Sequence, residues 1–279
     1  MSDHPLLPAA SAGSTVVVRP YALDAVLWPD HQAFSLQERL LIVGLRGSEA
    51  HGTYQPAASG GMDDRDVTAV FRAPRQFYLG MPRATGWEHA ESITGEWDVV
   101  CYEVRKFVGL LARQNPNVLS LLWLEPQHYL FLSPLGRRLV EARRLFRVRQ
   151  SAYDAFTGYA RAQLQKMTGH GAYRGYMGAK RKALVDQCGY DPKNAAHLVR
   201  LLHMGYEYLL SGMLNVARTW DRQMLIEIKT GSWPLAAVQS HAAAWTQRCQ
   251  DAYPESVLPE RLDVAAIDAL LLDVFAEME

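Results

Sequence analysis

The sequence has few of the features that mark several common classes of protein. Its 279 residues include only three cysteines, Cys101, Cys188 and Cys249, which lie far apart and form no Cys-x-x-Cys pair. This usage favours reduced thiols in a cytoplasmic protein over a disulfide framework. No apolar run approaches the roughly 20 residues of a membrane-spanning helix, so we expect no membrane association. The N-terminus lacks the basic and apolar regions of a secretory signal, and we expect residues 1–34 to form a partly flexible leader.

Several motifs of well-known enzymes are missing as well. The chain has no Gly-x₄-Gly-Lys-Ser/Thr loop and no Gly-x-Ser-x-Gly elbow, and its nine histidines show no zinc-ligand spacing. Lysine plus arginine and aspartate plus glutamate both number 29, which argues against a uniformly basic protein that coats nucleic acid. The segment from Ser133 to Lys182 is nevertheless basic, with twelve Lys or Arg against two acidic residues. Such a block fits either a solvated helical surface or a surface that holds polyphosphate or an RNA backbone.

Hydrophobic patterning predicts strands in the first half of the chain and helices in the second. Strands are expected at Leu40–Leu45, Asp64–Phe71 and Glu96–Tyr102, with an irregular stretch between the last two and then a helix at Glu103–Arg113. After Pro134 the pattern predicts helices at Leu135–Leu145, Ser151–Met167, Ala179–Cys188, Pro192–Leu210, Ala236–Asp251 and Val264–Ala276. The predicted class is α+β, with a catalytic domain over residues 35–132 and a helical domain over residues 133–279.

The most informative segment combines a glycine-serine turn with closely spaced carboxylates. Gly47 and Ser48 follow the first predicted strand, where backbone N–H groups can hold phosphate oxygens. Asp64 and Asp66 would project from one face of the second strand, and Asp98 could add a carboxylate from the third. Crowded carboxylates call for a cation, and a hard divalent ion such as Mg²⁺ or Mn²⁺ is the natural one. The pattern therefore indicates metal-assisted phosphoryl chemistry.

These residues resemble the signature of the DNA polymerase beta nucleotidyltransferase superfamily. The blocks GSEAHGTY, DDRDVTAVF, DVVCYEVRKFVGLLARQNPNVLSLLW and YDPKNAAHLVRLLHMGYEYLLSG look more specifically like predicted nucleotidyltransferases related to the RNA-ligase-associated, RlaP-like group. The resemblance runs from about Leu40 to the C-terminus. It implies a polymerase-beta-like core, in which a short mixed sheet with flanking helices is followed by a helical domain.

The resemblance also implies a reaction and a set of site residues. The reaction is the metal-dependent transfer of a nucleoside monophosphate from NTP to an acceptor hydroxyl, with Mg²⁺ or Mn²⁺ as cofactor. Gly47 and Ser48 would contact the triphosphate, Asp64 and Asp66 would bind both metals, and Asp98 would complete the metal set and help to activate the acceptor. Glu96 and Glu103 lie close enough in sequence to be alternatives to Asp98. Arg65 departs from the family pattern, because many relatives carry an apolar or aromatic residue between the two aspartates.

The helical half adds a basic stripe to this interpretation. Asp191 and Pro192 have the residue types of a helix start, and in the following helix Lys193, His197, Arg200, Met204 and Glu207 share one stripe, opposite a core face of leucines. The spacing of Lys193, His197 and Arg200 matches a recurring block of the family, which implies contacts to NTP phosphates or to the acceptor backbone. Lys180, Arg181 and Lys182 could widen this basic wall, and Tyr173 and Tyr176 could stack on a base.

Two other functions stay open at this point. The chain could be a non-catalytic nucleic-acid-binding or regulatory protein on the same fold, although the three carboxylates argue against it. The chemistry could instead be retained with a protein side chain or a small molecule as acceptor. The basic block from Arg137 to Lys182 favours RNA, but only weakly.

Overall fold

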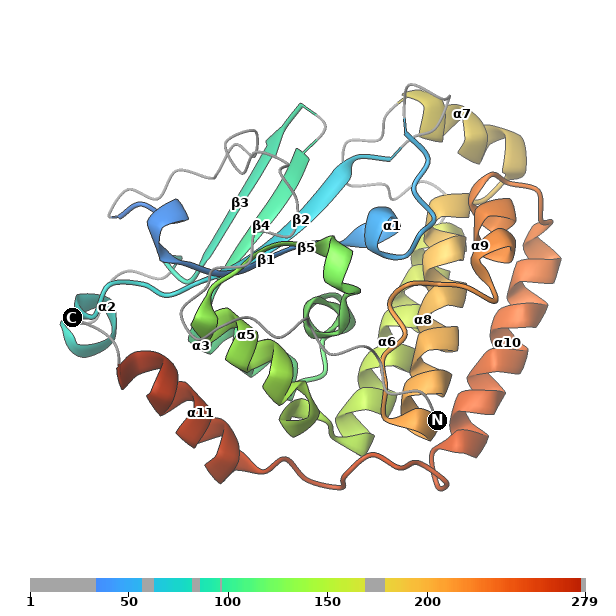
Figure 1. The fold of residues 1–279 in the computed structure, drawn as a ribbon. Coiled ribbons are helices and arrows are strands. Elements are labelled where there is room, and N and C mark those ends of the chain that lie inside the picture. Colours follow the sequence, from blue (N-terminus) through green and yellow to red (C-terminus); the bar gives the residue numbers. More distant parts are fainter. Residues whose placement is uncertain (1–33, 57–62, 82–85, 96, 169–178, 277–279) are drawn as a thin grey trace.

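A mixed sheet followed by a helical half forms the molecule (Figure 1). The computed structural model describes residues 34–56, 63–81, 86–95, 97–168 and 179–276. The sheet has five strands in the order β3-β4-β2-β1-β5: β1 Leu40–Leu45, β2 Arg65–Phe71, β3 His89–Thr94, β4 Trp97–Glu103 and β5 Tyr129–Leu132. β2 and β4 are parallel, whereas the other neighbouring strands are antiparallel. The predicted α+β class is confirmed.

The helices fall into a short group beside the sheet and a longer group after it. The first group comprises α1 Gly47–Ala50, α2 Gln76–Leu79, α3 Val104–Ala112, α4 Pro116–Leu119 and α5 Pro134–Glu141. The second comprises α6 Arg149–Thr168, α7 Ala179–Cys188, α8 Pro192–Ser211, α9 Arg222–Lys229, α10 Leu235–Ala252 and α11 Val264–Ala276. In the second group α6 and α10 pack against α8 (Figure 1). α11 returns toward the sheet, where the Val274 carbonyl accepts a hydrogen bond of 2.7 Å from Arg72 Nη1.

Apolar clusters cover both faces of the sheet, which explains why all six residues of β1 are buried. One cluster joins β1, α3 and α5 and continues without a break into α6, α8 and α10. The other lies across the opposite face, where Phe34, Phe77 and Trp87 pack on β-strand residues such as Val43 and Val67. The division at residues 132 and 133 stays a prediction, and the first cluster spans both sides of it.

The predicted elements are found where the hydrophobic pattern is strong, and they shift or fail where it is weak. The ranges of β1, α7 and α11 are as predicted, whereas β2 begins one residue later and β4 lies one residue further along the chain than expected. The strands β3 and β5, the short helices α2 and α4, and the helix α9 were not predicted. The polar β3 lies in the stretch expected to be irregular, and pairs only with β4 at the edge of the sheet. The leader lies outside the described residues except for Phe34.

Candidate active site

The candidate site lies where the end of β1 meets the starts of β2 and β4. β1 ends beside β2, with Leu45 paired to Val67 and the Arg46 N–H donating to the Asp66 carbonyl over 2.8 Å. The parallel register of β2 and β4 then places Asp66 directly opposite Asp98. Side chains of directly opposed residues project from the same face of a sheet, so the two carboxylates become neighbours. Helix α1 begins at this same corner, directly after Arg46.

Gly47 allows the turn and Asp66 to approach each other closely. Its φ angle is +63°, in the left-handed region that favours glycine. A Cβ atom at this position would lie 2.0 Å from Asp66 Oδ2, which is inside any permitted contact. Gly47 is therefore required both by its backbone conformation and by its distance from the carboxylate. The fold therefore brings the glycine-serine turn against the second strand.

Arg46 lies between the two carboxylates, and sequence reasoning did not identify it. Its Nη2 atom is 2.9 Å from Asp98 Oδ2 and 3.8 Å from Asp66 Oδ1. Burial raises the pKa of Asp66 to about 6; Asp98 and Asp64 raise this pKa too, whereas Arg46 and Lys193 lower it. Asp66 therefore ionises less readily than an ordinary aspartate, because its charge is partly desolvated and has like charges close by.

The other candidate carboxylates are placed less uniformly. Asp64 is exposed and lies just before β2 rather than within it, although its charge still acts on Asp66. Glu103 is buried at the far end of β4, about 16 Å along the strand from Asp98 at ~3.3 Å per residue. It caps α3 and accepts a hydrogen bond of 2.6 Å from Tyr78, so it is a structural carboxylate. Glu96 lies outside the described residues.

The carboxylate chemistry fits a divalent cation, but the ion pairs with Arg46 must give way to one. Two carboxylates in register, with Asp64 nearby, are the oxygen donors that Mg²⁺ and Mn²⁺ prefer. In the described part of the chain, no three His, Cys, Asp or Glu side chains are already grouped as a metal site. Asp66 and Asp98 would provide ligands once Arg46 moves, and Asp64 would need to turn toward them. The predicted metal set of Asp64, Asp66 and Asp98 stays a prediction.

A pocket of about 240 Å³ opens beside this corner and joins both halves of the molecule. Among the predicted site residues, those that line it are Gly47, Ser48, Asp66, Lys193, His197 and Arg200. Further polar residues in the lining are Arg46, His51, Thr53, Asn117, Ser120, Arg181, Asn194 and Lys229. Asp64 and Asp98 do not line it. The structure therefore brings the glycine-serine turn, one aspartate and the basic stripe to one cavity.

Helix α8 presents its basic residues to this cavity because its start is fixed. The Asp191 carboxylate accepts hydrogen bonds from the N–H groups of Lys193 and Asn194, at 3.1 and 3.3 Å, and Pro192 occupies the first turn, as predicted. Arg181 of α7 also bonds Asp191, over 2.6 Å. The cap thus aligns Lys193 with the pocket and connects it to the predicted basic wall. Lys180 and Lys182 are exposed, and Tyr173 and Tyr176 lie outside the described residues.

The stripe of α8 is more buried than an amphipathic pattern predicts. Met204, predicted to lie opposite the core face, is wholly buried and belongs to the core. Burial lowers the pKa of Arg200 to about 9, and Arg218 lowers it too, whereas Asp221 raises it, so Arg200 is charged at neutral pH. Burial and the cations Arg200, Lys166 and Lys193 hold the pKa of His197 well below its usual range. His197 is therefore a neutral hydrogen-bonding group there.

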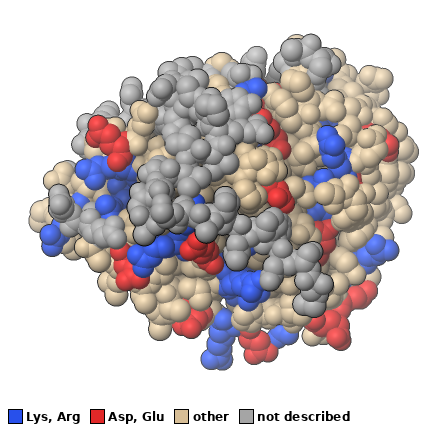
Figure 2. Space-filling model, in the orientation of Figure 1, with Lys and Arg blue, Asp and Glu red and all other residues tan. Residues whose placement is uncertain are grey.

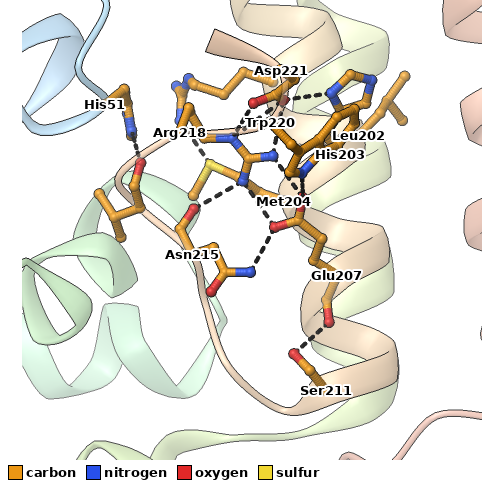
Figure 3. Close-up of polar contacts among 12 residues, drawn as sticks. His51, Leu202, His203, Met204, Glu207, Ser211, Asn215, Arg218, Trp220 and Asp221 are labelled. Atoms are coloured by element: carbon orange, nitrogen blue, oxygen red, sulfur yellow. Dashed lines mark hydrogen bonds and ion pairs between the residues drawn. The ribbon is translucent and has the colours of Figure 1, made fainter. Parts of the chain in front are cut away.

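A buried polar network fixes the helical half against the glycine-serine turn (Figure 3). Arg218 bonds Glu207 at 2.6 and 2.9 Å and Asp221 at 2.9 to 3.2 Å, and Asp221 in turn bonds His203 Nδ1 at 2.6 Å. The backbone N–H of Arg218 donates a hydrogen bond of 3.2 Å to the backbone carbonyl of His51, and His51 Nδ1 lies 2.9 Å from the Val216 carbonyl. The loop after α1 is therefore held by the segment that follows α8.

Sequence reasoning missed Lys229, which lines the pocket, and its ion-pair partner Asp63, which lies behind it. Asp63 is buried and forms an ion pair with Lys229, 166 positions away in the sequence. Asp63 stands in the acidic run before β2 and could have been singled out there, but Lys229 ends α9, a helix that was not predicted. Nothing in the local pattern of either residue indicates its partner.

Charges of both signs are interspersed over the face of the molecule seen in Figure 2. Several arginines of the basic block are in ion pairs, as Arg138 is with Asp273 and Arg149 with Glu260. Arg143 instead lies over the ring of Trp123, 4.6 Å from its centroid. The described part of the block is thus dispersed over α5, α6, α7 and the segment between α5 and α6, and Arg138, Arg149 and Arg181 within it have carboxylate partners.

Comparison with known families agrees with the geometry of this corner. Residues 30–273 match the model of the RNA repair pathway DNA polymerase beta family, RlaP. No curated protein matches the chain. Among the described residues no helix has both the length and the apolar character needed to cross a membrane. The match covers most of the 279 residues, and the chain therefore belongs to the RNA repair pathway DNA polymerase beta family, a family of polymerase-beta-like nucleotidyltransferases.

Proposed function

We propose that the protein transfers a nucleoside monophosphate from an NTP to an acceptor hydroxyl, with Mg²⁺ or Mn²⁺ as cofactor. The observation that supports this most directly is the meeting of Asp66, Asp98 and the Gly47 turn at one corner, beside a pocket that Gly47 and Asp66 line together with basic residues. Carboxylates at the edge of the sheet and cations on the helical side of the pocket suit a polyphosphate ligand with a bound divalent metal. Family membership supports the same class of reaction.

In the proposed reaction the acceptor oxygen bonds to the α-phosphorus as the bond to the α,β-bridging oxygen breaks. Pyrophosphate leaves, and the acceptor proton passes to a carboxylate, for which Asp98 is the predicted residue. A bound divalent metal would lower the pKa of the acceptor hydroxyl and neutralise charge on the leaving group. Gly47 and Ser48 would hold phosphate oxygens. Lys193 and Arg200 would balance the charge of the triphosphate, Lys193 through its compact ammonium group and Arg200 through the paired N–H donors of its planar guanidinium. His197 would bond a phosphate or a ribose hydroxyl.

RNA is the acceptor that we favour, because the family is described by an RNA repair pathway. A protein side chain or a small molecule would use the same chemistry at the same pocket. The test is incubation with each α-labelled NTP, Mg²⁺ or Mn²⁺, and cellular RNA and protein as separate fractions. We expect label in RNA, loss of all label in Asp66→Asn, and retention in the surface variant Asp273→Asn. Label in protein or in small molecules alone would reject RNA as the acceptor.

A second candidate, a non-catalytic binding protein, is favoured by one specific observation. Arg46 already neutralises the carboxylates of Asp66 and Asp98, as the permanent counter-ion of an inactive site would. Such a protein would bind nucleotide or RNA equally well with and without a chelator and would label no acceptor. Equal binding by Asp64→Ala, Asp66→Ala and the unmodified chain would support it, whereas metal-dependent label transfer would exclude it.

A further inference from the structure

Asp63 is a buried carboxylate without a role in the proposed metal set. It is 4% exposed, although it directly precedes the exposed Asp64. Its Oδ2 atom accepts a hydrogen bond of 2.8 Å from the Gln55 N–H and is also bonded by Lys229 Nζ. Its Oδ1 atom has no hydrogen bond among the described residues, and Lys193 Nζ lies 3.7 Å from it. One carboxylate therefore faces two ammonium groups.

The two lysines come from different helices and meet at one wall of the pocket. Lys229 ends α9, is 6% exposed, and donates a second hydrogen bond of 3.0 Å to the Thr53 carbonyl. Lys193 lies in the first turn of α8, and its side chain is 38% exposed. Both line the pocket that also contains Asp66. Lys229 is thus held rigidly, whereas Lys193 keeps donors available to a ligand.

The charge at this wall is unbalanced in favour of an anion. Asp63 forms ion pairs with both lysines, and Asp66 also acts electrostatically on them. Arg200 adds a third cation to the pocket, whereas Arg181 and Arg46 are paired with Asp191 and Asp98. Three cations therefore face two carboxylates. A diphosphate group carries several negative charges and enough oxygen atoms to accept hydrogen bonds from both lysines. A neutral sugar would leave this excess charge uncompensated, and a single carboxylate would offer only two oxygen atoms to the two lysines.

We propose that Asp63 is a positioning residue that holds Lys193 and Lys229 together as the receptor for the diphosphate end of the NTP and for free pyrophosphate. The inference rests on the proposed function, because it assigns the part of the same pocket that the leaving group occupies. Asp63 itself would not contact the ligand. Loss of its charge would leave Lys229 buried without a counter-ion and would release Lys193 from the wall.

Metal-free binding of inorganic pyrophosphate, measured by calorimetry, tests the proposal. We expect Asp63→Asn to weaken this binding by about tenfold, the lower end of the effect of one lost hydrogen bond to a charged group. The double variant Lys193→Ala/Lys229→Ala should weaken it at least as much. Adding Asp63→Asn to that double variant should change nothing further, because Asp63 acts only through the lysines. A merely structural role for Asp63 would give an additional loss in that background.

Two controls keep the outcome decisive. Nucleoside monophosphate, which lacks the diphosphate, should bind Asp63→Asn and the unmodified chain equally, and Asp273→Asn should leave both ligands unaffected. If Asp63→Asn does not fold, Lys193→Ala provides the test, because the Lys193 side chain is partly exposed and its loss should be tolerated. This variant must bind pyrophosphate more weakly and nucleoside monophosphate unchanged. Pyrophosphate binding that is unchanged in folded Asp63→Asn overturns the inference alone. Binding that is unchanged in Lys193→Ala overturns it together with the proposed contact of Lys193 to the triphosphate. No pyrophosphate binding by the unmodified chain overturns it together with the proposed pocket.

Discussion

Gly47 shows how strictly single residues are constrained at this corner. Its backbone conformation favours glycine, and the missing side chain leaves the space that Asp66 Oδ2 occupies. A short turn of this kind lets backbone N–H groups approach a phosphate as closely as they approach this carboxylate. The pairing of Gly47 with Asp66 is therefore the residue-scale feature on which the geometry of the site depends.

Replacement of Gly47 by alanine should damage the site and the fold together. We expect a loss of roughly 1–3 kcal/mol in stability from the left-handed backbone, and a displaced Asp66 carboxylate that abolishes label transfer. Thermal unfolding and the label-transfer assay measure the two effects. Gly158→Ala is the matched control, since a Cβ there meets nothing within 4 Å in helix α6 and should stabilise by about 0.5–1 kcal/mol. Equal behaviour of the two variants would contradict this account of Gly47.

The pKa of Asp66 predicts a definite pH dependence of stability. Its value is about 6 in the folded chain, against 3.8 for the ordinary group, so the fold favours the protonated form. The stabilising contribution is therefore full below pH 3.8 and is lost as the pH rises through about 6. Across this window Asp66→Asn should gain stability relative to the unmodified chain, measured as a difference in melting temperature. Parallel curves of melting temperature against pH for Asp66→Asn and the unmodified chain would refute the raised pKa of Asp66.

At the scale of elements, the sequence predicts best those segments whose pattern is decided locally. β1 is a continuous apolar run, and α8 begins with a capping aspartate and a proline, so their starts are predicted correctly. β3 is polar and gains its strand conformation only by pairing with β4, and the four-residue β5 is stabilised by pairing with β1. Such strands depend on partners that a local pattern does not reveal.

The connection between α8 and α9 carries a prediction of its own, because Arg218 there is only 3% exposed and bonds two acids (Figure 3). Arg218→Ala should cost about 3–5 kcal/mol, since it leaves Asp221 and Glu207 without their shared cation. Urea denaturation at an unchanged m-value would measure the loss. Arg138→Ala, which breaks the exposed pair with Asp273, should cost no more than about 1 kcal/mol. Similar losses in both variants would show that the network does not fix the helical half.

At the scale of the whole molecule, the site is shared between the sheet and the helical half. Family resemblance connects the basic stripe of α8 with the carboxylates in function. The distance between them could not be predicted from the sequence, because it depends on how α8 packs beside α1. Asp63 and Lys229 are even less predictable, since their ion pair joins segments 166 residues apart through an unpredicted helix. Arg46 was missed for a different reason: its role follows from the register of β2 and β4 rather than from any motif.

The most direct test of the central claim is the binding of Mn²⁺ in the presence of a non-hydrolysable NTP, followed by electron paramagnetic resonance. We predict bound Mn²⁺ in the unmodified chain and in Asp273→Asn. In Asp66→Asn and in Asp98→Asn we predict at least a tenfold loss of Mn²⁺ affinity, because each substitution removes a charged oxygen ligand. Undiminished Mn²⁺ binding in both of these variants, or none in the unmodified chain, would contradict this claim.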